Sequence, residues 1–276
     1  MLQTGKAIKM PVEDLKRMQA IQLDLLVEID RICRKNHIRY CIIGGTLLGA
    51  VRHKGVIPWD DDIDVGMTRK EYAKFVRACA KDLNAQKYFL QDVKSDKGYR
   101  WGYAKLLRNG TIYERDGQEH LKMKKAIFAD IFIYDGVPNN YILEKIQCFI
   151  CFCIRKTLWS PVGKVVSSGM LLRCWYGLLS LIPKKISVWM MHLVSMLCPV
   201  KEKNIWLRSI TFPVKYKREW LMELVEMEFD GHLVYAPKAA DAMLSYQYGN
   251  YMQLPPENEQ VGHITASYYD LGDADM

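Results

Sequence analysis

The sequence predicts an α+β fold in which a mixed sheet is flanked by helices. In the first half of the 276-residue chain, amphipathic segments alternate with short apolar runs, an order that builds a sheet with helices packed on it. One such run carries two aspartates, Asp62 and Asp64, at alternate positions. From residue 139 onward, apolar patches broken by Arg and Lys predict a helical insert that is both basic and apolar.

Helices are expected where apolar residues recur at steps of three and four. The first one starts after Pro11, a residue that suits the first turn of a helix, and continues from Leu15 through Ile32. Thr68 and Glu71 have the spacing of a capping box, which predicts that another helix starts between them. The helices expected outside the insert are 12–36, 46–52, 69–82 and 237–248.

Strands are expected where short apolar runs are bounded by turn residues. The first run ends at Gly44 and Gly45, and the second alternates acidic with apolar residues. The expected strands are 38–43, 62–67, 88–93, 101–107 and 127–134. Together with the helices between them, they favour a mixed sheet over a bundle or a sandwich.

The stretch from Gly44 to Asp64 contains the residues best suited to chemistry. A strand that ends in two glycines and opens a helix lets the backbone approach a phosphate, with amide N–H groups free to donate. Asp62 and Asp64 lie two residues apart on a strand, so their carboxylates share one side. Because paired carboxylates repel each other, this pattern is typical of a divalent cation site. The alternative is a tight turn followed by an acidic strand edge.

Further aspartates surround this pair. Asp130 opens another apolar run and is the natural third carboxylate, unless it is an ordinary turn residue at a strand edge. Asp60 and Asp61 precede the strand, and at least one of them is expected to support the loop rather than to bind a metal. Four aspartates in five positions are more than a solvated loop needs, which favours the metal site.

Several motifs of this sequence resemble the LicD family, which includes the fukutin-related proteins. The longest is GGTLLGAVRHKGVIPWDDDIDVGMTRKEYAKF, at 44–75. The resemblance continues in AKLLRNGTIYE at 104–114, FADIFIYDG at 128–136 and YGNYMQLPPENEQVGH at 248–263. It covers about 12–138 and 228–265 and leaves the central basic segment unexplained.

The resemblance implies a nucleotidyltransferase fold of the polymerase-β type. Residues 1–138 would form the catalytic core, 139–215 the helical insert, and 216–276 a segment that completes the domain. The family moves a phosphorylated alcohol, such as phosphocholine, from a CDP-linked donor to a glycan hydroxyl and releases CMP. The implied acceptor is a cell-surface glycan, such as a lipopolysaccharide or teichoic acid, or its lipid-linked precursor. The implied cofactor is Mg²⁺ or Mn²⁺.

Matching positions also imply roles for single residues. Asp62 and Asp64 would hold the metal, and Asp130 would complete the site or act as the base. The donor phosphates would be lined by Gly44, Gly45 and Thr46, with charge partners Arg52, His53, Lys105 and Arg108. His263 falls on the family's late histidine. Two positions depart from the family pattern, Ile133 where proline is usual and Gln260 where a basic residue is common.

Two more side chains near the acidic loop are candidates for the site. Trp59 could stack on a base or on a choline headgroup, although packing of the loop is the favoured interpretation. Asp61 is a further candidate beside the two expected ligands. Both remain expectations until the loop is placed.

The net charge of +8 is concentrated in one segment. Residues 139–220 contain thirteen Lys or Arg and three Glu, beside several Trp and long apolar runs. Either these helices are buried as a subdomain, or they form a surface for anionic lipid headgroups, the favoured interpretation. Without a signal peptide or a spanning segment, the chain is expected in the cytoplasm, with peripheral contact on the inner face of the plasma membrane.

Two other functions compete with the phosphotransferase. A true nucleotidyltransferase would take an NTP and release pyrophosphate, and the fold alone does not distinguish the two. A basic nucleic-acid-binding protein is disfavoured, because the positive charges are interleaved with long apolar runs and no groove-reading motif is present. No nucleic-acid partner is therefore expected.

Overall fold

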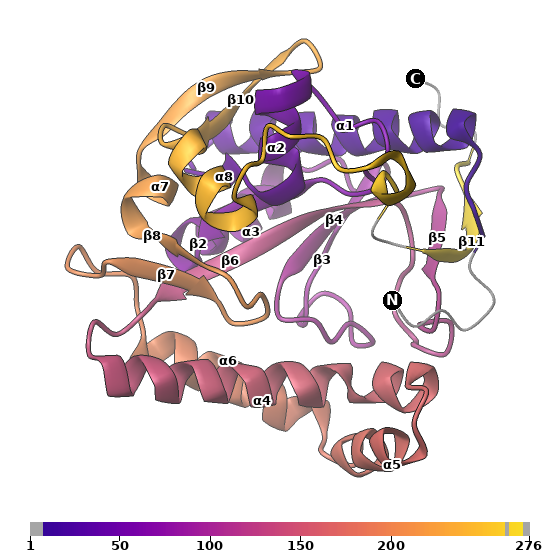
Figure 1. Ribbon diagram of the computed structural model, residues 1–276, viewed down its shortest axis with the longest axis vertical. Coiled ribbons are helices and arrows are strands. Elements are labelled where there is room, and N and C mark those ends of the chain that lie inside the picture. The colour runs from indigo at the N-terminus through magenta and orange to yellow at the C-terminus, as the bar shows by residue number, and fades with distance from the viewer. Residues whose placement is uncertain (1–7, 263–264, 273–276) are drawn as a thin grey trace.

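The structure is a computed structural model that describes residues 8–262 and 265–272 (Figure 1). The helices are α1 (Val12–Lys35), α2 (Gly44–His53), α3 (Arg69–Asp82), α4 (Tyr141–Val166), α5 (Met170–Leu179), α6 (Lys184–Leu197), α7 (Arg218–Met222) and α8 (Ala240–Tyr248), with a 3₁₀ turn at Glu257–Glu259. The strands are β1 (Cys41–Ile42), β2 (Asp64–Thr68), β3 (Tyr88–Gln91), β4 (Ala104–Arg108), β5 (Ile112–Arg115), β6 (Phe128–Gly136), β7 (Trp206–Ser209), β8 (Lys215–Lys217), β9 (Leu224–Phe229), β10 (His232–Pro237) and β11 (Ala266–Asp270).

The main sheet is mixed and has β6 at its centre. Its strand order is β1-β2-β6-β4-β3, with β7 and β8 attached to the far end of β6. β2 runs parallel to β6, whereas β4 and β7 pair with β6 antiparallel. Every residue of β6 is buried, as expected of a strand covered on both faces. The predicted α+β fold with a mixed sheet flanked by helices is confirmed.

The two faces of the sheet have different neighbours. α1 and α3 pack on one face, against β2, β4 and β6. Side chains alternate along β6, so Asp135 points to this face, where Arg69 of α3 binds its carboxylate. Asp130, five residues earlier, points to the other face, where β4 supplies its partner Lys105. The catalytic candidates therefore gather on the face away from α1 and α3.

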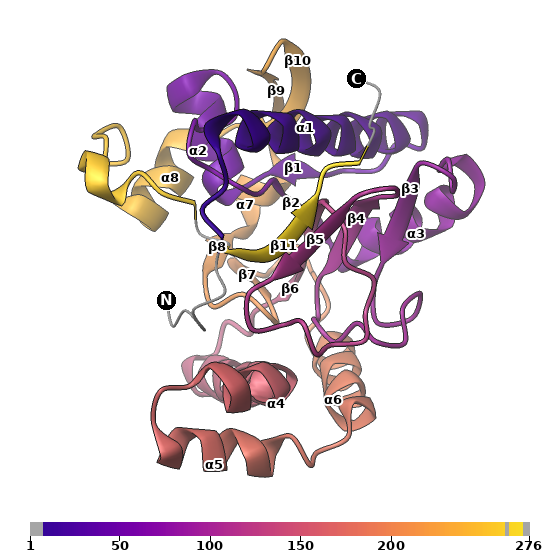
Figure 2. The ribbon, with the colours of Figure 1, turned by 90° about the vertical axis from the view of Figure 1, so that its right-hand side faces the viewer.

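The helices α4, α5 and α6 form a separate layer beyond the sheet (Figures 1 and 2). They have a small apolar core of their own around Cys151, Ile154 and Met191. Gln147 of α4 joins this layer to the sheet by donating to the carbonyl of Gly136, 2.8 Å away. Among the described helices, none combines the length and the apolar character that a membrane span requires.

Local signals account for several of the observed boundaries. The helix expected from residue 69 is α3, and the Thr68 hydroxyl accepts the amide of Glu71, as its capping spacing predicts. The strand expected at 38–43 pairs only over Cys41–Ile42, because the amide of Ile38 bonds back to Cys33 at the end of α1. The helix expected at 46–52 already starts at Gly44.

We expect the Arg69–Asp135 pair to stabilise the end of β6. Both guanidinium-to-carboxylate distances are 2.6 Å, and the Asp135 side chain is 2% exposed. Arg69→Ala leaves that buried carboxylate without its cation, which should lower the free energy of unfolding by about 2 kcal/mol. Urea denaturation measures the change. Lys217→Ala, which breaks the exposed Lys217–Glu219 pair, is the control and should have little effect. Equal losses in the two variants would contradict the assignment.

Candidate active site

Three charged side chains form a row across the centre of the sheet. Asp64 of β2 lies directly opposite Asp130 of β6, which in turn lies opposite Lys105 of β4. Residues opposite each other in a sheet project to the same face, so the three side chains are neighbours. The predicted association of Asp64 with Asp130 thus follows from the register of two parallel strands.

The acidic loop that precedes β2 brings more carboxylates to this row. Carboxylate oxygens of Asp60, Asp61 and Asp62 lie within 4.8 Å of one another. The loop is held from below by α1, where Gln19 donates to the carbonyl of Asp60 and Gln22 to that of Asp61, each at 2.8 Å. These hydrogen bonds fix the backbone of the loop, so its carboxylates remain close together although they repel one another.

The glycine turn packs directly against these carboxylates. Gly44 has a φ of +58°, and a Cβ at this position would lie 3.2 Å from an oxygen of Asp64. A Cβ on Gly45 would lie 2.7 Å from an oxygen of Asp60. The hydroxyl of Thr46 accepts the amide of Asp64 at 2.8 Å. The turn therefore fixes the start of β2, and its two glycines let the backbone pack closely against the acids.

The negative charges of this cluster would be stabilised by a bound cation. Burial, reinforced by Asp62, Asp130 and Asp60, raises the pKa of Asp64 well above its ordinary value. Burial and the neighbouring acids Asp62 and Asp61 raise the pKa of Asp60 to about 8. Within the part of the chain that the structure describes, the buried Oδ1 of Asp64 has no hydrogen-bond partner. An oxygen-rich set with an unsatisfied carboxylate is the donor set that Mg²⁺ and Mn²⁺ prefer. The residues present therefore fit a divalent cation.

Asp130 is held by two cations. Its carboxylate bonds to the ammonium of Lys105, and the guanidinium of Arg115 on β5 lies 3.8 Å away. Burial and the charge of Arg115 lower the pKa of Lys105 to about 7, against the opposing pull of Asp130. The Lys105 ammonium also lies over the ring of Phe128, 3.3 Å from its centroid. Asp130 thus stands where the acidic side of the site meets a basic side.

Two predicted phosphate partners face away from the acidic cluster. Arg108 lies on the opposite face of β4 from Lys105 and pairs with Asp24 of α1 at 3.0 Å. Arg52 donates to the carbonyl of Tyr251 at 2.9 Å and so binds the C-terminal segment to α2. The structure does not bring either guanidinium to the carboxylate row.

Other predicted residues lie at the rim of the site. The ring of His53 is edge-on to Trp59, with centroids 5.9 Å apart, and Trp59 packs against the main core. Burial and the charge of Arg52 lower the pKa of His53. His263 lies outside the described residues, but a Cβ on Gly262, just before it, would lie 2.4 Å from an oxygen of Asp61. The C-terminal segment therefore crosses beside the acidic loop.

Sequence reasoning missed three members of this site. At least one of Asp60 and Asp61 was expected to support the loop, and Asp60 was not proposed as a ligand, yet its carboxylate faces Gly45. Arg115 follows the motif AKLLRNGTIYE by one residue, so the signal stood next to the predicted motif. Tyr248 of α8 directs its hydroxyl towards Gly44, and burial and Asp64 raise its pKa.

We expect divalent metal to stabilise the chain, and more strongly at high pH. With the Asp60 pKa raised from 3.8 to about 8, the folded state keeps a proton that the unfolded state has lost. The metal-free chain should therefore lose stability as pH rises from about 4 to about 8. Metal needs the ionised carboxylates, so its effect grows over the same range. Scanning calorimetry should show a gain of roughly 6 °C with Mn²⁺ at a hundredfold excess over Kd.

The matched variants separate this effect from nonspecific binding. Asp62→Asn/Asp64→Asn should remove the metal-induced gain, whereas Glu228→Gln, on an exposed position of β9, should keep it. A gain that survives in the double variant would show that the metal binds elsewhere.

Comparison with known proteins identifies the family. The model for the LicD/FKTN/FKRP nucleotidyltransferase domain matches residues 37–171. A lipopolysaccharide cholinephosphotransferase LicD from Haemophilus influenzae is 30% identical over 273 residues, which cover 93% of this chain and 98% of that protein.

More distant relatives share parts of the chain. The ribitol 5-phosphate transferase FKRP of Mus musculus is 38% identical over 105 residues, 38% of this chain and 15% of that protein. A solved structure, terminal uridylyl transferase 4 from Trypanosoma brucei with bound GTP, matches 56% of this chain and 53% of its own at 15% identity, with a TM-score of 0.23, too low to support an argument. On the family model and the full-length relative, the chain belongs to the LicD family of phosphotransferases.

Proposed function

We propose that this chain transfers a phosphorylated alcohol, phosphocholine or a similar group, from a CDP-linked donor to a hydroxyl of a cell-surface glycan or its lipid-linked precursor. The products are the phosphodiester and CMP. The observation that carries the proposal is the buried, unpartnered oxygen of Asp64, set between the glycine turn and the acidic loop. A cation bound there would neutralise the charge that develops when the phosphoryl group moves.

The chain's own residues then divide the work. Asp62 and Asp64 hold the Mg²⁺ or Mn²⁺, with Asp60 and Asp61 beside them. Gly44, Gly45 and Thr46 line the donor phosphates, where the bare glycine backbone leaves room for a close approach. These assignments rest on the contacts of the turn with the acids and on the family's shared motifs.

Asp130 is the proposed proton acceptor. It faces the acids on one side and Lys105 and Arg115 on the other, so it adjoins both a metal-bound donor and a second substrate. The acceptor oxygen forms a bond to the donor phosphorus, the bond from that phosphorus to the CMP oxygen breaks, and the proton of the hydroxyl passes to Asp130.

A panel of donors tests this function. Purified protein with Mn²⁺ would be incubated with CDP-choline, CDP-ethanolamine, CDP-ribitol or CTP, and released CMP and pyrophosphate would be measured. We expect one CDP-alcohol to yield CMP, and Asp62→Asn/Asp64→Asn to lower the rate by at least about a thousandfold. Glu228→Gln is the control with unchanged rate. Pyrophosphate from CTP, with every CDP-alcohol inert, would instead make the chain a nucleotidyltransferase.

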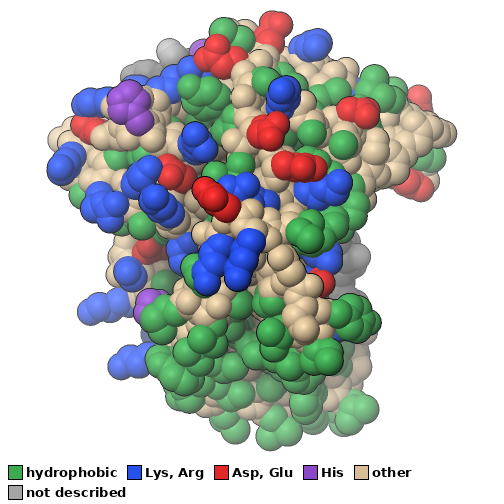
Figure 3. All heavy atoms as spheres, turned by 90° about the vertical axis from the view of Figure 1, so that its left-hand side faces the viewer, with side chains coloured by type: hydrophobic (Ala, Val, Ile, Leu, Met, Phe, Trp, Pro, Cys, Tyr) green, Lys and Arg blue, Asp and Glu red, His purple; other side chains and the backbone are tan. Residues whose placement is uncertain are grey.

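We further propose that α4, α5 and α6 rest on an anionic membrane surface. Large apolar side chains on these helices are exposed, among them Leu171 (87%), Leu178 (64%) and Trp175 (54%). Figure 3 shows the hydrophobic side chains gathered at the end of the molecule that these helices form, with Lys and Arg above them. Since thirteen basic and three acidic residues lie in 139–220, the charge favours anionic lipid over a basic partner. The chain would then act as a peripheral membrane enzyme on the inner face of the plasma membrane.

Vesicle binding checks the membrane contact. We expect the chain to sediment with phosphatidylglycerol-containing vesicles but not with pure phosphatidylcholine, and Leu171→Glu/Trp175→Glu to lose this binding. Leu233→Glu, at a 58% exposed position on the β10 hairpin, is the control that keeps it. A concentration-dependent dimer that Leu171→Glu/Trp175→Glu dissociates, without vesicle binding, would show that the apolar face covers a second copy instead.

A further inference from the structure

A cavity of about 500 Å³ lies between the sheet and the helical layer, beside the candidate active site. Its walls come from the loop before β4, from the end of β5, and from α4 and α5. Its volume lies in the range of pockets that hold small organic ligands. Arg115 lines this cavity and so connects it with the candidate active site.

The lining of this cavity is aromatic and basic. Trp101 and Trp159 pack against each other in its wall, with ring centroids 5.7 Å apart, and Tyr176 of α5 also lines the cavity. Arg155 and Lys156 of α4 line it as well. None of the described residues that line the cavity is acidic. Aromatic faces pack against the apolar faces of sugar rings, while Arg and Lys bind phosphate, so this lining suits a ligand with both features.

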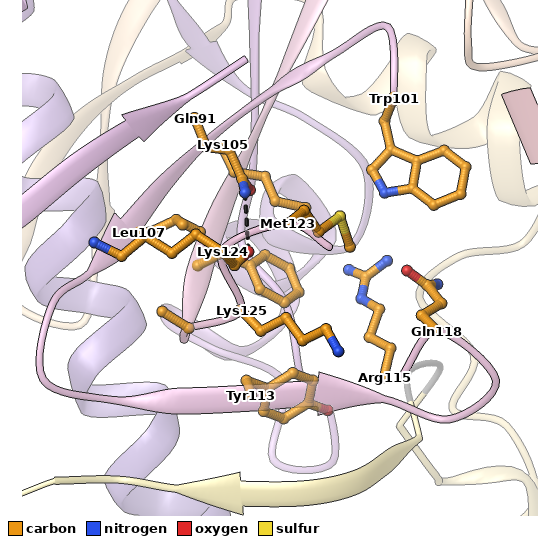
Figure 4. Close-up of a pocket in the computed structure, with 12 residues that line it drawn as sticks. Gln91, Trp101, Lys105, Leu107, Tyr113, Arg115, Gln118, Met123, Lys124 and Lys125 are labelled. Carbon is orange, nitrogen blue, oxygen red and sulfur yellow. Dashed lines mark hydrogen bonds between the residues drawn. The ribbon is translucent and has the colours of Figure 1, made fainter. Parts of the chain in front are cut away.

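Arg115 connects the cavity to Asp130. It lines the large cavity and also a narrow pocket of about 20 Å³ that reaches Lys105, and Trp101 and Gln118 border both spaces. Figure 4 shows Arg115 directed towards Trp101 and Gln118. Among the described residues, the buried Nε and Nη2 of Arg115 and the Oε1 of Gln118 have no hydrogen-bond partner. Unsatisfied buried polar groups are costly, so the two arginine nitrogens favour a ligand that accepts from them, and the glutamine oxygen favours one that donates to it.

The order of groups across the site separates this cavity from the donor's place. The glycine turn contacts Asp60 and Asp64, on the β1–β2 side of the sheet. Arg115 approaches Asp130 from β5, and the cavity extends beyond it towards α4. Asp130 therefore stands between the acids that would hold the donor and the cavity.

We infer that this cavity binds the acceptor through a phosphorylated sugar, with the phosphate on Lys156, Arg155 and Arg115 and the ring against the wall that the two tryptophans form. The identification of this ligand as the acceptor rests on the proposed function, because the attacking hydroxyl must come from the side of Asp130 opposite to the donor. The site itself rests on the cavity, its charge and its unpartnered donors.

Titration of the full chain with small probes tests the site without turnover. Tryptophan fluorescence would follow the addition of glucose 1-phosphate, glucose, inorganic phosphate and glycerol 3-phosphate. We expect glucose 1-phosphate to bind most tightly, Lys156→Gln to weaken it about tenfold through the lost charge-assisted contact, and Trp159→Phe to reduce the fluorescence change. Lys164→Gln, an exposed position further along α4 and outside the cavity, should leave its affinity unchanged.

The other outcomes contradict either the inference or the proposed function, each in a distinct way. No binding of glucose 1-phosphate, or equal binding in Lys156→Gln, removes the site. Equally tight glycerol 3-phosphate would make it a phospholipid headgroup site. If Lys156→Gln weakens CDP-choline binding in the presence of Mn²⁺, the cavity belongs to the donor. Glucose 1-phosphate binding that depends on Lys156 in a chain that turns over only CTP would leave the site standing and refute the proposed function.

Discussion

Mutual repulsion among buried carboxylates is the constraint on which the arrangement of this molecule depends. Asp64 is surrounded by the charges of Asp62, Asp130 and Asp60, and their repulsion together with burial raises its pKa well above normal. Such a cluster persists only if other interactions hold it together. Two glutamines of α1 hold the acidic loop by its carbonyl groups, and Thr46 fixes the amide of Asp64. The helix on one face of the sheet and the turn at its end thus fix the backbone that carries these carboxylates.

The fold resolves the repulsion differently on the two sides of the row. On the β4 and β5 side, Lys105 and Arg115 supply positive charge to Asp130 from within the chain. On the glycine side, the buried oxygen of Asp64 has no such partner among the described residues. The protein therefore neutralises one carboxylate itself and leaves the other for a cation. This asymmetry gives the row a direction, with an acidic end that could hold a metal and a basic end that opens towards α4.

Sequence reasoning succeeded where structure is decided locally. The helix from residue 69 follows from Thr68 and Glu71. The strand expected at 62–67 is present but begins only at Asp64, which pairs with Asp130, so Asp62 lies in the loop before the strand and not on it. The Asp230–Gly231 turn of the β9–β10 hairpin was a local signal that was overlooked, since both residues have the positive φ that such turns require. Alternation alone separates Lys105 from Arg108, which are three residues apart on one strand and therefore face opposite sides.

Other features depend on contacts that no local pattern contains. β11 pairs with β5 across some 150 residues of sequence, and β7 joins β6 from beyond the helical layer. The position of Arg115 is set by these distant pairings, because β5 is the strand to which β11 adds. In the sequence, Arg115 is a single arginine after a recognisable motif. Only the folded structure places its guanidinium 3.8 Å from Asp130.

The helical layer has a physical reason to be where it is. Helices of this composition, basic in charge and apolar on their exposed side, could bind a membrane from any position on the molecule. Here α4 contributes Arg155, Lys156 and Trp159 to a cavity whose inner end is Arg115. The layer that would contact lipid is thus also the layer that would enclose the second substrate. An acceptor carried by a lipid would enter from the membrane side and reach Asp130 without crossing the donor, and this geometry explains why the insert lies at the basic end of the carboxylate row.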